Sequence, residues 1–130
     1  MQILTSFRPF LIALLLGSLA AVASAAGVDY DKARFDAAVA AGKPVIVEFA
    51  ADWCPTCKAQ KPVVAELLGD AQFKDITLFV ADFDKETALK KQLRVPQQST
   101  FVVFKGGKEV ARSTGQTRKE ALATLFAKAL

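Results

Sequence analysis

The motif Cys54-Pro-Thr-Cys57 constrains this chain more than any other feature, because it holds the only two cysteines among 130 residues. An apolar run at 45–47 precedes it, and a helical pattern at 58–68 follows it. A C-x-x-C pair at such a strand-to-helix junction is typical of a dithiol catalyst. A helix N-terminus stabilises a thiolate, which is the nucleophile of disulfide exchange. The motif therefore predicts that Cys54 attacks a substrate disulfide and that Cys57 resolves the mixed disulfide.

Two other uses of the cysteine pair are open alternatives. A structural disulfide that closes so short a loop constrains the unfolded chain little, so it stabilises the fold poorly. A zinc or copper site uses thiolates but needs further ligands, and the chain has no His, no third Cys and no Met beyond Met1. We therefore expect redox chemistry with no bound metal and no cofactor beyond the Cys54–Cys57 disulfide itself.

Several residues at fixed distances from the dithiol resemble those of the thioredoxin family. Glu48 lies six residues before the first cysteine, where the family has a buried acid, and Pro62 lies five residues after the second, where the family kinks its active-site helix. The segment 104–109, Phe-Lys-Gly-Gly-Lys-Glu, is similar to the family's last hairpin, and Gly115 follows it as in the family. The resemblance covers about residues 30–130.

Two short segments resemble one branch of the family more closely. Ala-Asp-Trp-Cys at 51–54 and Ala-Asp-Phe-Asp at 81–84 are similar to the thioredoxin-like domain at the periplasmic end of membrane reductant transporters. This resemblance implies a reductase of protein disulfides that receives electrons from a membrane thiol donor. The exported oxidases of this fold carry a large helical insertion, for which the chain has no room. The alternative is a binding module that keeps the fold but handles a metal ion or a partner protein.

The order of expected elements agrees with an α/β thioredoxin fold. Expected helices lie between Asp29 or Asp31 and Gly42, at 58–68, at 85–93 and from a capping box at 117–120 onward, and expected strands lie at 45–49, 76–81, 100–104 and 109–113. Strands joined through helices pair in parallel, and a hairpin adds antiparallel strands. We therefore expect a mixed central sheet of four to five strands with helices on both faces, and a short first strand.

Residues 1–25 have the pattern of a signal peptide. Arg8 precedes an apolar stretch at 10–22, and Ala-Ser-Ala at 23–25 offers small residues for cleavage. The apolar stretch is shorter than the ~20 residues that span a bilayer, which disfavours the alternative of an uncleaved membrane anchor. We therefore expect an exported, periplasmic protein with one mature domain at 26–130.

Glu48 is the expected proton acceptor for Cys57. An acid inside an apolar strand is desolvated, which raises its pKa and suits it to act as a general base. The alternation of the strand also permits Glu48 to face water, and the family resemblance favours the buried position. The family often has a lysine near this acid, whereas the matching residue here is Asp82. Two carboxylates close together would raise each other's pKa.

The resemblance also implies a set of substrate-contacting residues around the dithiol. These are Trp53, Pro55, Gln98, Ser99 and Thr100. Trp53 is expected to shield one side of the cysteine pair, and Pro55 suits the first turn of the helix. Gln98 is expected to offer its backbone groups to an extended substrate.

Ser99 marks the clearest departure from the family, which places a cis-proline opposite the cysteines at this position. We expect a trans Gln98–Ser99 bond, because a cis bond before a non-proline residue costs roughly 2.5–4 kcal/mol. An insertion would let Pro96 serve instead. Ser99 is expected to leave the sulfurs more open than a proline ring does, and its hydroxyl is able to hydrogen-bond a thiolate.

The distribution of charged residues indicates which kinds of partner the protein binds. The formal net charge is +4, and the basic residues are scattered, with Lys90-Lys91 and Arg118-Lys119 as the two adjacent pairs. Nucleic-acid binding requires a clustered basic surface, so we expect no nucleic-acid partner. The expected partners are protein disulfides and a membrane thiol donor, and we expect the protein to be a monomer.

Overall fold

The computed structural model describes residues 27–130. The expected signal peptide at 1–25, its cleavage site and the alternative of an uncleaved anchor lie outside the described residues. Within residues 27–130, none of the helices has the length and apolar character needed to cross a membrane.

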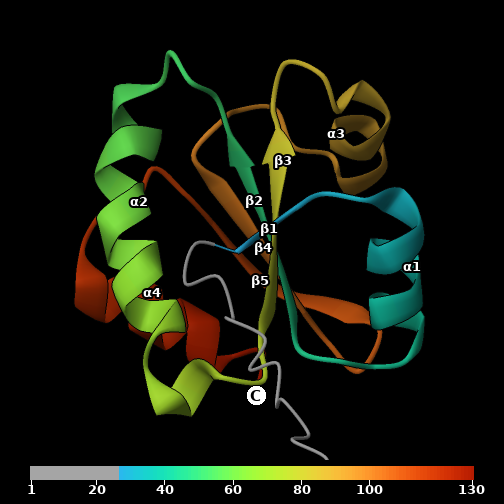
Figure 1. The fold of residues 1–130 in the computed structure, drawn as a ribbon. Coiled ribbons are helices and arrows are strands. Elements are labelled where there is room, and N and C mark those ends of the chain that lie inside the picture. The colour runs from blue at the N-terminus through green and yellow to red at the C-terminus, as the bar shows by residue number, and fades with distance from the viewer. Residues whose placement is uncertain (1–26) are drawn as a thin grey trace, which may run out of the picture.

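A five-stranded mixed sheet forms the centre of the molecule, with strand order β1-β3-β2-β4-β5 (Figure 1). Its strands are β1 (Val28–Asp29), β2 (Val45–Ala50), β3 (Thr77–Asp82), β4 (Thr100–Lys105) and β5 (Lys108–Thr114). β3 pairs in parallel with β1 and β2, whereas β4 pairs antiparallel with β2 and β5. The expected thioredoxin fold and the short first strand are both confirmed.

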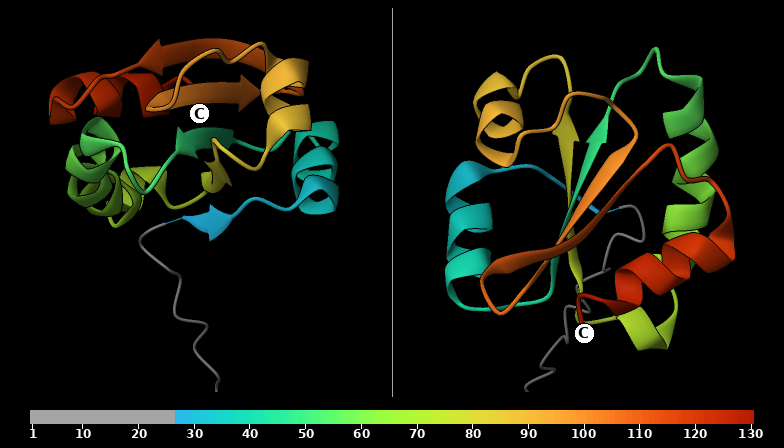
Figure 2. Two further views of the ribbon diagram at one scale, coloured as in Figure 1. Left: turned by 90° about the horizontal axis from the view of Figure 1, so that it is seen from above. Right: turned by 180° about the vertical axis from the view of Figure 1, so that it is seen from behind.

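The helices cover both faces of this sheet. They are α1 (Lys32–Ala40), α2 (Pro55–Leu68), α3 (Thr87–Leu93) and α4 (Lys119–Ala127), with a 3₁₀ turn at Ala71–Phe73. Helices α1 and α3 lie on one face, and α2 and α4 lie on the other (Figure 2). The site residues at the start of α2 therefore lie at one end of a three-layer structure.

Strand β2 shows why this layering holds. Its side chains alternate, so Val45, Val47 and Phe49 pack under α1 and α3, whereas Ile46 packs under α2 and α4. These four apolar side chains are fully buried, as expected for a central strand covered on both faces. By the same alternation, Glu48 shares the face of Ile46 and points toward α2.

Three helices start at other residues than expected. Helix α2 begins at Pro55 rather than at residue 58. Helix α3 begins at Thr87 rather than at residue 85. Thr117 does not cap α4: the N-cap residue is Arg118, which has no side-chain cap bond, so Glu120 falls one position too early for a capping box. The Gln116 side chain bonds the N–H groups at this helix start instead: its Oε1 accepts from those of Thr117 (3.1 Å) and Arg118 (3.0 Å).

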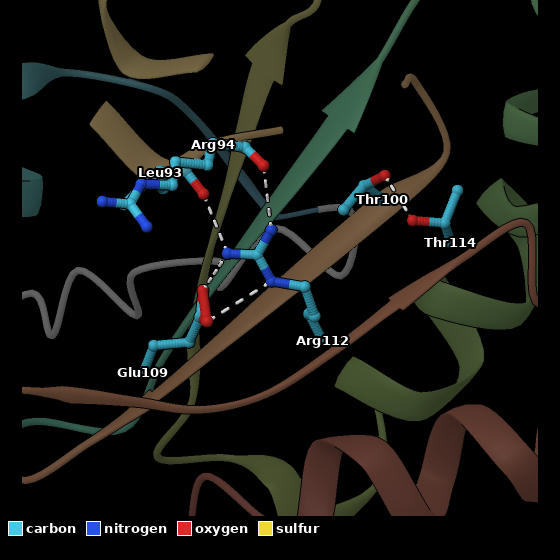
Figure 3. Close-up of polar contacts among 6 residues, drawn as sticks. All are labelled: Leu93, Arg94, Thr100, Glu109, Arg112 and Thr114. Atoms are coloured by element: carbon cyan, nitrogen blue, oxygen red, sulfur yellow. Dashed lines mark hydrogen bonds and ion pairs between the residues drawn. The ribbon is translucent and has the colours of Figure 1, made fainter. Parts of the chain in front are cut away.

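Arg112 on β5 binds the C-terminal end of α3 and holds it against the sheet (Figure 3). Its guanidinium donates to the carbonyl oxygens of Leu93 (2.8 Å) and Arg94 (3.2 Å) and pairs with Glu109. Arg94 adopts a left-handed conformation (φ 54°) that ends the helix. The loop that leaves α3 toward the cysteines is therefore held at its first residue.

The far end of the same loop is held at Thr100, the first residue of β4. Its hydroxyl lies 2.8 Å from the Thr114 hydroxyl on β5 (Figure 3) and also donates to the Gln97 carbonyl at 2.8 Å. Anchors at residues 94 and 100 thus fix the short segment that carries Ser99.

Candidate active site

Cys54 precedes α2 and caps its N-terminus. Its backbone is extended (φ −86°, ψ 112°), and Pro55 occupies the first turn of the helix. The Cys57 N–H donates to Cys54 Sγ at 3.1 Å, so the sulfur takes the position that a side-chain oxygen holds in an ordinary N-cap. Both cysteines are free thiols. The first sulfur therefore lies at the helix N-terminus, where the sequence placed it.

The surroundings of the two sulfurs shift their pKa values in opposite directions. Burial raises the pKa of Cys54, but hydrogen bonds from the Cys57 thiol, the Ser99 hydroxyl and the N–H groups of Cys57 and Thr56 outweigh it, and the pKa of Cys54 lies below its usual value. Burial raises the pKa of Cys57, and its hydrogen bond to Cys54 raises that pKa further. Cys54 is therefore the cysteine that ionises first.

Ser99 lies directly against both sulfurs. Its Oγ is 3.1 Å from Cys54 Sγ and 3.1 Å from Cys57 Sγ. Its backbone is left-handed (φ 59°), and its N–H donates to the Phe49 carbonyl at 2.8 Å while its own carbonyl accepts from the Gly115 N–H at 2.9 Å. The hydroxyl is therefore held in place by backbone bonds to β2 on one side and to the loop after β5 on the other.

This geometry settles which residue lies opposite the cysteines. No cis peptide bond occurs among the described residues, so the Gln98–Ser99 bond is trans, as expected. The alternative that Pro96 packs in the cis form against the dithiol is wrong, because Pro96 is exposed and Ser99 fills that space.

Both sulfurs are deeply buried with Ser99 beside them. Cys54 is only 1% exposed and Cys57 only 2%. The Ser99 hydroxyl fills the space beside the two sulfurs, and Ala51 and Phe83 pack against the cysteine pair.

Glu48 is buried on the α2 face of β2, with 4% of its surface exposed. Burial raises the pKa of Glu48 to about 7, although the nearby Lys61 ammonium lowers it. The expectation of a buried acid with a raised pKa is confirmed. The residue lines a cavity of about 390 Å³ beside α2, whose other lining includes Lys61, Pro62 and Val64.

Cys57 lines a neighbouring cavity of about 300 Å³, which also contains Lys61 and Asp82. The two cavities share Ala50, Lys61 and Val80 as lining residues. No direct hydrogen bond joins Glu48 to either cysteine within the described chain. Asp82 lies on the Cys57 side rather than in the Glu48 cavity, and the charged group that acts on the pKa of Glu48 is Lys61. The expected pairing of two carboxylates is therefore not what raises this pKa.

The predicted substrate residues divide into an exposed group and a supporting group. Trp53 is 56% exposed, and its Nε1–H donates to Asp84 Oδ2 at 2.8 Å, which fixes the ring beside the cysteines. Pro55 is exposed and Gln98 is half-buried. Thr100 is buried with its hydroxyl bonded inside the protein, so its side chain supports the loop from within.

Sequence reasoning missed Gln60. Its side chain is fully buried on α2, and its Nε2 donates to the carbonyls of Gln116 (2.9 Å) and Ser99 (3.4 Å). It therefore links α2, the Ser99 segment and the start of α4. The sequence contained one indication of this role, because Gln60 interrupts the buried apolar face of α2. Its hydrogen-bond partners lie far away in the sequence, so they could not be identified.

The dithiol has no third ligand of the usual kinds beside it. Among residues 27–130, no group of three or more His, Cys, Asp or Glu side chains is placed to hold a metal ion. The hydrogen bonds that converge on Cys54 suit a reactive thiolate.

A thioredoxin fold with such a dithiol at the N-terminus of α2 defines the class of thiol–disulfide exchange sites. The sequence model of the family Thioredoxin matches residues 27–128. The chain therefore belongs to the thioredoxin family.

Individual relatives agree with this membership. The chain is 36% identical over 84 residues to a thioredoxin of Chlamydia trachomatis serovar D, covering 65% of this chain and 80% of that protein. It is 35% identical over 83 residues to Thioredoxin H2-1 of Oryza sativa subsp. japonica, covering 64% of this chain. The aligned part spans 59% of the length of that rice protein and 57% of the length of rice Thioredoxin H2-2.

Solved structures show the same fold. The crystal structure of Trxlp from Edwardsiella tarda EIB202 has a TM-score of 0.74 and 39% identity, covering 76% of this chain and 96% of that chain. Thioredoxin (Mala s 13) from Malassezia sympodialis has a TM-score of 0.70 at 21% identity, covering 79% of this chain and 91% of that chain. The second comparison concerns the fold alone.

Proposed function

We propose that the protein is an exported, periplasmic thiol–disulfide oxidoreductase that works as a reductase on protein disulfides. The observation that carries the proposal is the position of Cys54 Sγ at the N-terminus of α2, where it accepts from the Cys57 N–H at 3.1 Å and lies 3.1 Å from the Ser99 hydroxyl. These contacts lower the pKa of Cys54 against the effect of burial, whereas burial raises that of Cys57. Such a pair supplies a thiolate for the first step and a protonated thiol in reserve for the second.

The first step uses the Cys54 thiolate. It attacks one sulfur of the substrate disulfide, a bond forms between Cys54 and that sulfur, and the other substrate sulfur leaves as a thiolate. Hydrogen bonds from Ser99 and from the Cys57 N–H hold the attacking sulfur at the start of α2. Trp53, Pro55 and Gln98 are the residues proposed to contact an extended substrate.

The second step resolves the mixed disulfide. Cys57 loses its proton and attacks Cys54, which forms the intramolecular disulfide and releases the second substrate sulfur as a thiolate. Two electrons thus pass from the dithiol to the substrate. Glu48 is the proposed proton acceptor, and it acts through water because its cavity adjoins that of Cys57 without a direct bond.

The cellular setting is proposed from the sequence. A signal-like segment at 1–25 supports export, and an exported reductase needs an electron source because disulfides persist outside the cytosol. The resemblance of residues 51–54 and 81–84 to the periplasmic domain of membrane reductant transporters supports a membrane thiol donor. The protein is proposed to act as a monomer and without a bound cofactor or metal.

Two measurements test the proposal. Turnover of insulin disulfides with dithiothreitol is expected for the wild type and lost in Cys54→Ala. No turnover, with a metal copurifying at stoichiometry, supports a binding module instead.

The reduction potential of the dithiol decides whether the protein reduces or oxidises its substrates. Equilibration with glutathione buffers is expected to give a value below about −200 mV, whereas a value near −120 mV indicates an oxidase.

A further inference from the structure

One face of α3 carries a row of cations that the redox mechanism does not use. Thr87, Lys90, Lys91 and Arg94 recur at i, i+3, i+4 and i+7, so they lie on one side of the helix. Together with Val95 and Pro96 they line an open groove of about 450 Å³, which we call the α3 groove. Val95 and Pro96 make its apolar part.

The charge of the α3 groove is not neutralised by the protein's own ion pairs. Within the described chain, Lys90, Lys91 and Arg94 take part in none of the salt bridges. Asp82 lies 3.7 Å from the Lys85 ammonium, and Glu109 pairs with Arg112, so these two acids act on other cations. Glu86 precedes α3 and its charge offsets part of the row, but no acidic residue is among those that line the α3 groove. The groove therefore presents a net positive charge to solvent.

The α3 groove is linked to the dithiol site through Phe83 and through the loop at 95–99. The Lys90 ammonium lies 3.9 Å from the centre of the Phe83 ring, and Phe83 packs against the cysteine cluster. Pro96 stands three residues before Ser99, whose hydroxyl touches both sulfurs. Helix α3 and the start of α2 also lie at the same end of the sheet (Figure 1). A chain bound at Cys54 and continuing toward α3 thus passes over these cations.

We propose that the α3 groove is a docking surface for an acidic segment of the protein whose disulfide is exchanged at Cys54. This inference rests on the proposed function, because the groove adds recognition to a site that must first exchange disulfides. Clustered charges beside a reactive group raise the rate of encounter with partners of opposite charge, and salt weakens the effect. The occupant is a peptide segment rich in Asp and Glu, extended alongside its cysteine.

The test compares two synthetic peptides that contain the same intramolecular disulfide, one flanked by glutamates and one by lysines. The reduced full protein is mixed with excess peptide, and oxidation of the dithiol is followed through Trp53, the single tryptophan, which adjoins Cys54. We expect the acidic peptide to react about 10-fold faster at ~10 mM ionic strength, and the two rates to converge in ~0.5 M salt.

A charge-reversal pair assigns this preference to the α3 groove. Lys91→Glu with Arg94→Glu changes the net charge by four, and it leaves Lys90 on the Phe83 ring. Lys105→Glu with Lys108→Glu makes the same change of net charge at the exposed hairpin between β4 and β5. We expect the first variant to lose or reverse the preference and the second to keep it.

The outcomes separate the two proposals. If neither peptide is reduced, the proposed function fails. If both are reduced at equal rates in low salt, the exchange function holds and the docking surface is overturned. It is also overturned if both charge-reversal variants lose the preference equally, because net charge and not the α3 groove then explains it. A lower melting temperature of the α3 variant with an unchanged preference means that these cations only stabilise the helix end.

Discussion

The two sides of the dithiol are built by different physical means. On the Cys54 side, fixed donors close to the sulfur stabilise negative charge: the Ser99 hydroxyl and the Cys57 N–H both lie at 3.1 Å. On the Cys57 side, burial dominates, and it raises the pKa of both Cys57 and Glu48. The comparison teaches that short hydrogen bonds prepare the nucleophile, whereas burial keeps the resolving thiol protonated and brings the pKa of Glu48 to about 7, where its carboxylate is able to accept that proton.

The largest expected effect comes from removing one sulfur at a time. Cys54→Ala is expected to abolish exchange, because no other thiolate lies at the helix N-terminus. Cys57→Ala is expected to retain the first step and accumulate mixed disulfides through Cys54. Non-reducing gel electrophoresis with mass spectrometry of the adducts checks this. Adducts found on Cys57 in Cys54→Ala, at a wild-type rate, would contradict the assigned roles.

Glu48→Gln tests the buried side next. Above pH 7 the Glu48 carboxylate is largely ionised and able to accept a proton, so the wild-type rate of resolution is expected to rise as the pH passes through about 7. The variant is expected to resolve the mixed disulfide roughly 10- to 100-fold more slowly at pH 8, at or below the lower limit of the ~10²- to 10⁴-fold range for general bases, because water relays the proton. Stopped-flow measurement of resolution across pH 6 to 9 checks this, and an unchanged profile removes Glu48 from the mechanism.

The same substitution has an opposite effect on stability. The pKa of Glu48 is about 7 when folded against a model value of 4.5, so the folded state holds the proton more tightly. Its stability therefore falls as the pH rises from about 4.5 through 7, by about 3 kcal/mol as an upper estimate. Glu48→Gln is expected to remove this loss and to be more stable than the wild type at pH 8. Urea unfolding at pH 5 and pH 8 checks the sign; a variant less stable at pH 8 contradicts it.

Ser99→Ala tests the hydrogen-bonded side. A hydrogen bond to a charged group contributes about 1.5–3 kcal/mol, so its loss is expected to raise the pKa of Cys54 by roughly one unit or more. The rate of attack at pH 6 should fall about 10-fold in proportion to the thiolate fraction. The control is Ser113→Ala, which removes the hydroxyl of a half-buried serine on β5. Alkylation rates against pH provide the readout, and an unchanged Cys54 pKa would remove Ser99 from thiolate stabilisation.

The smallest effect is expected at Lys61, which lines both cavities. Lys61→Gln removes the charge that lowers the pKa of Glu48, so the pH midpoint of resolution should move upward. Lys58→Gln is the matched control, because Lys58 lines the Cys57 cavity but not that of Glu48. The midpoint from stopped-flow data is the measurement; equal shifts in both variants would point to a general effect of net charge.

Fixed spacings made much of the site predictable. The positions of Cys54, Glu48 and Ser99 followed from their distances to the motif and to the final hairpin, because the register of β2 and β4 carries them together. Alternation in β2 left two faces open for Glu48, and only packing under α2 decided between them. The sequence did not show how deeply the two sulfurs are buried, because their burial depends on packing against Ala51 and Phe83.

Other parts of the site depend on contacts between distant segments. The Gln60 side chain on α2 donates to the carbonyls of Ser99 and Gln116. The charged residue that acts on the pKa of Glu48 is Lys61, also on α2, and not the expected Asp82. The capping pattern at 117–120 was misleading for a local reason, because the Gln116 side chain accepts from the N–H groups of Thr117 and Arg118. Local patterns cannot show which of several polar side chains reaches a partner.

The relative acidity of the two thiols tests the central claim most directly. The reduced protein is alkylated with limiting iodoacetamide at pH values from 5 to 10, and mass spectrometry of the peptides reports each cysteine separately. The account predicts that Cys54 reacts with a pKa well below the ~8.5 of a free thiol, and that Cys57 reacts only above it. If Cys57 proves to be the more acidic and faster of the two, the assignment of nucleophile and resolving cysteine is contradicted.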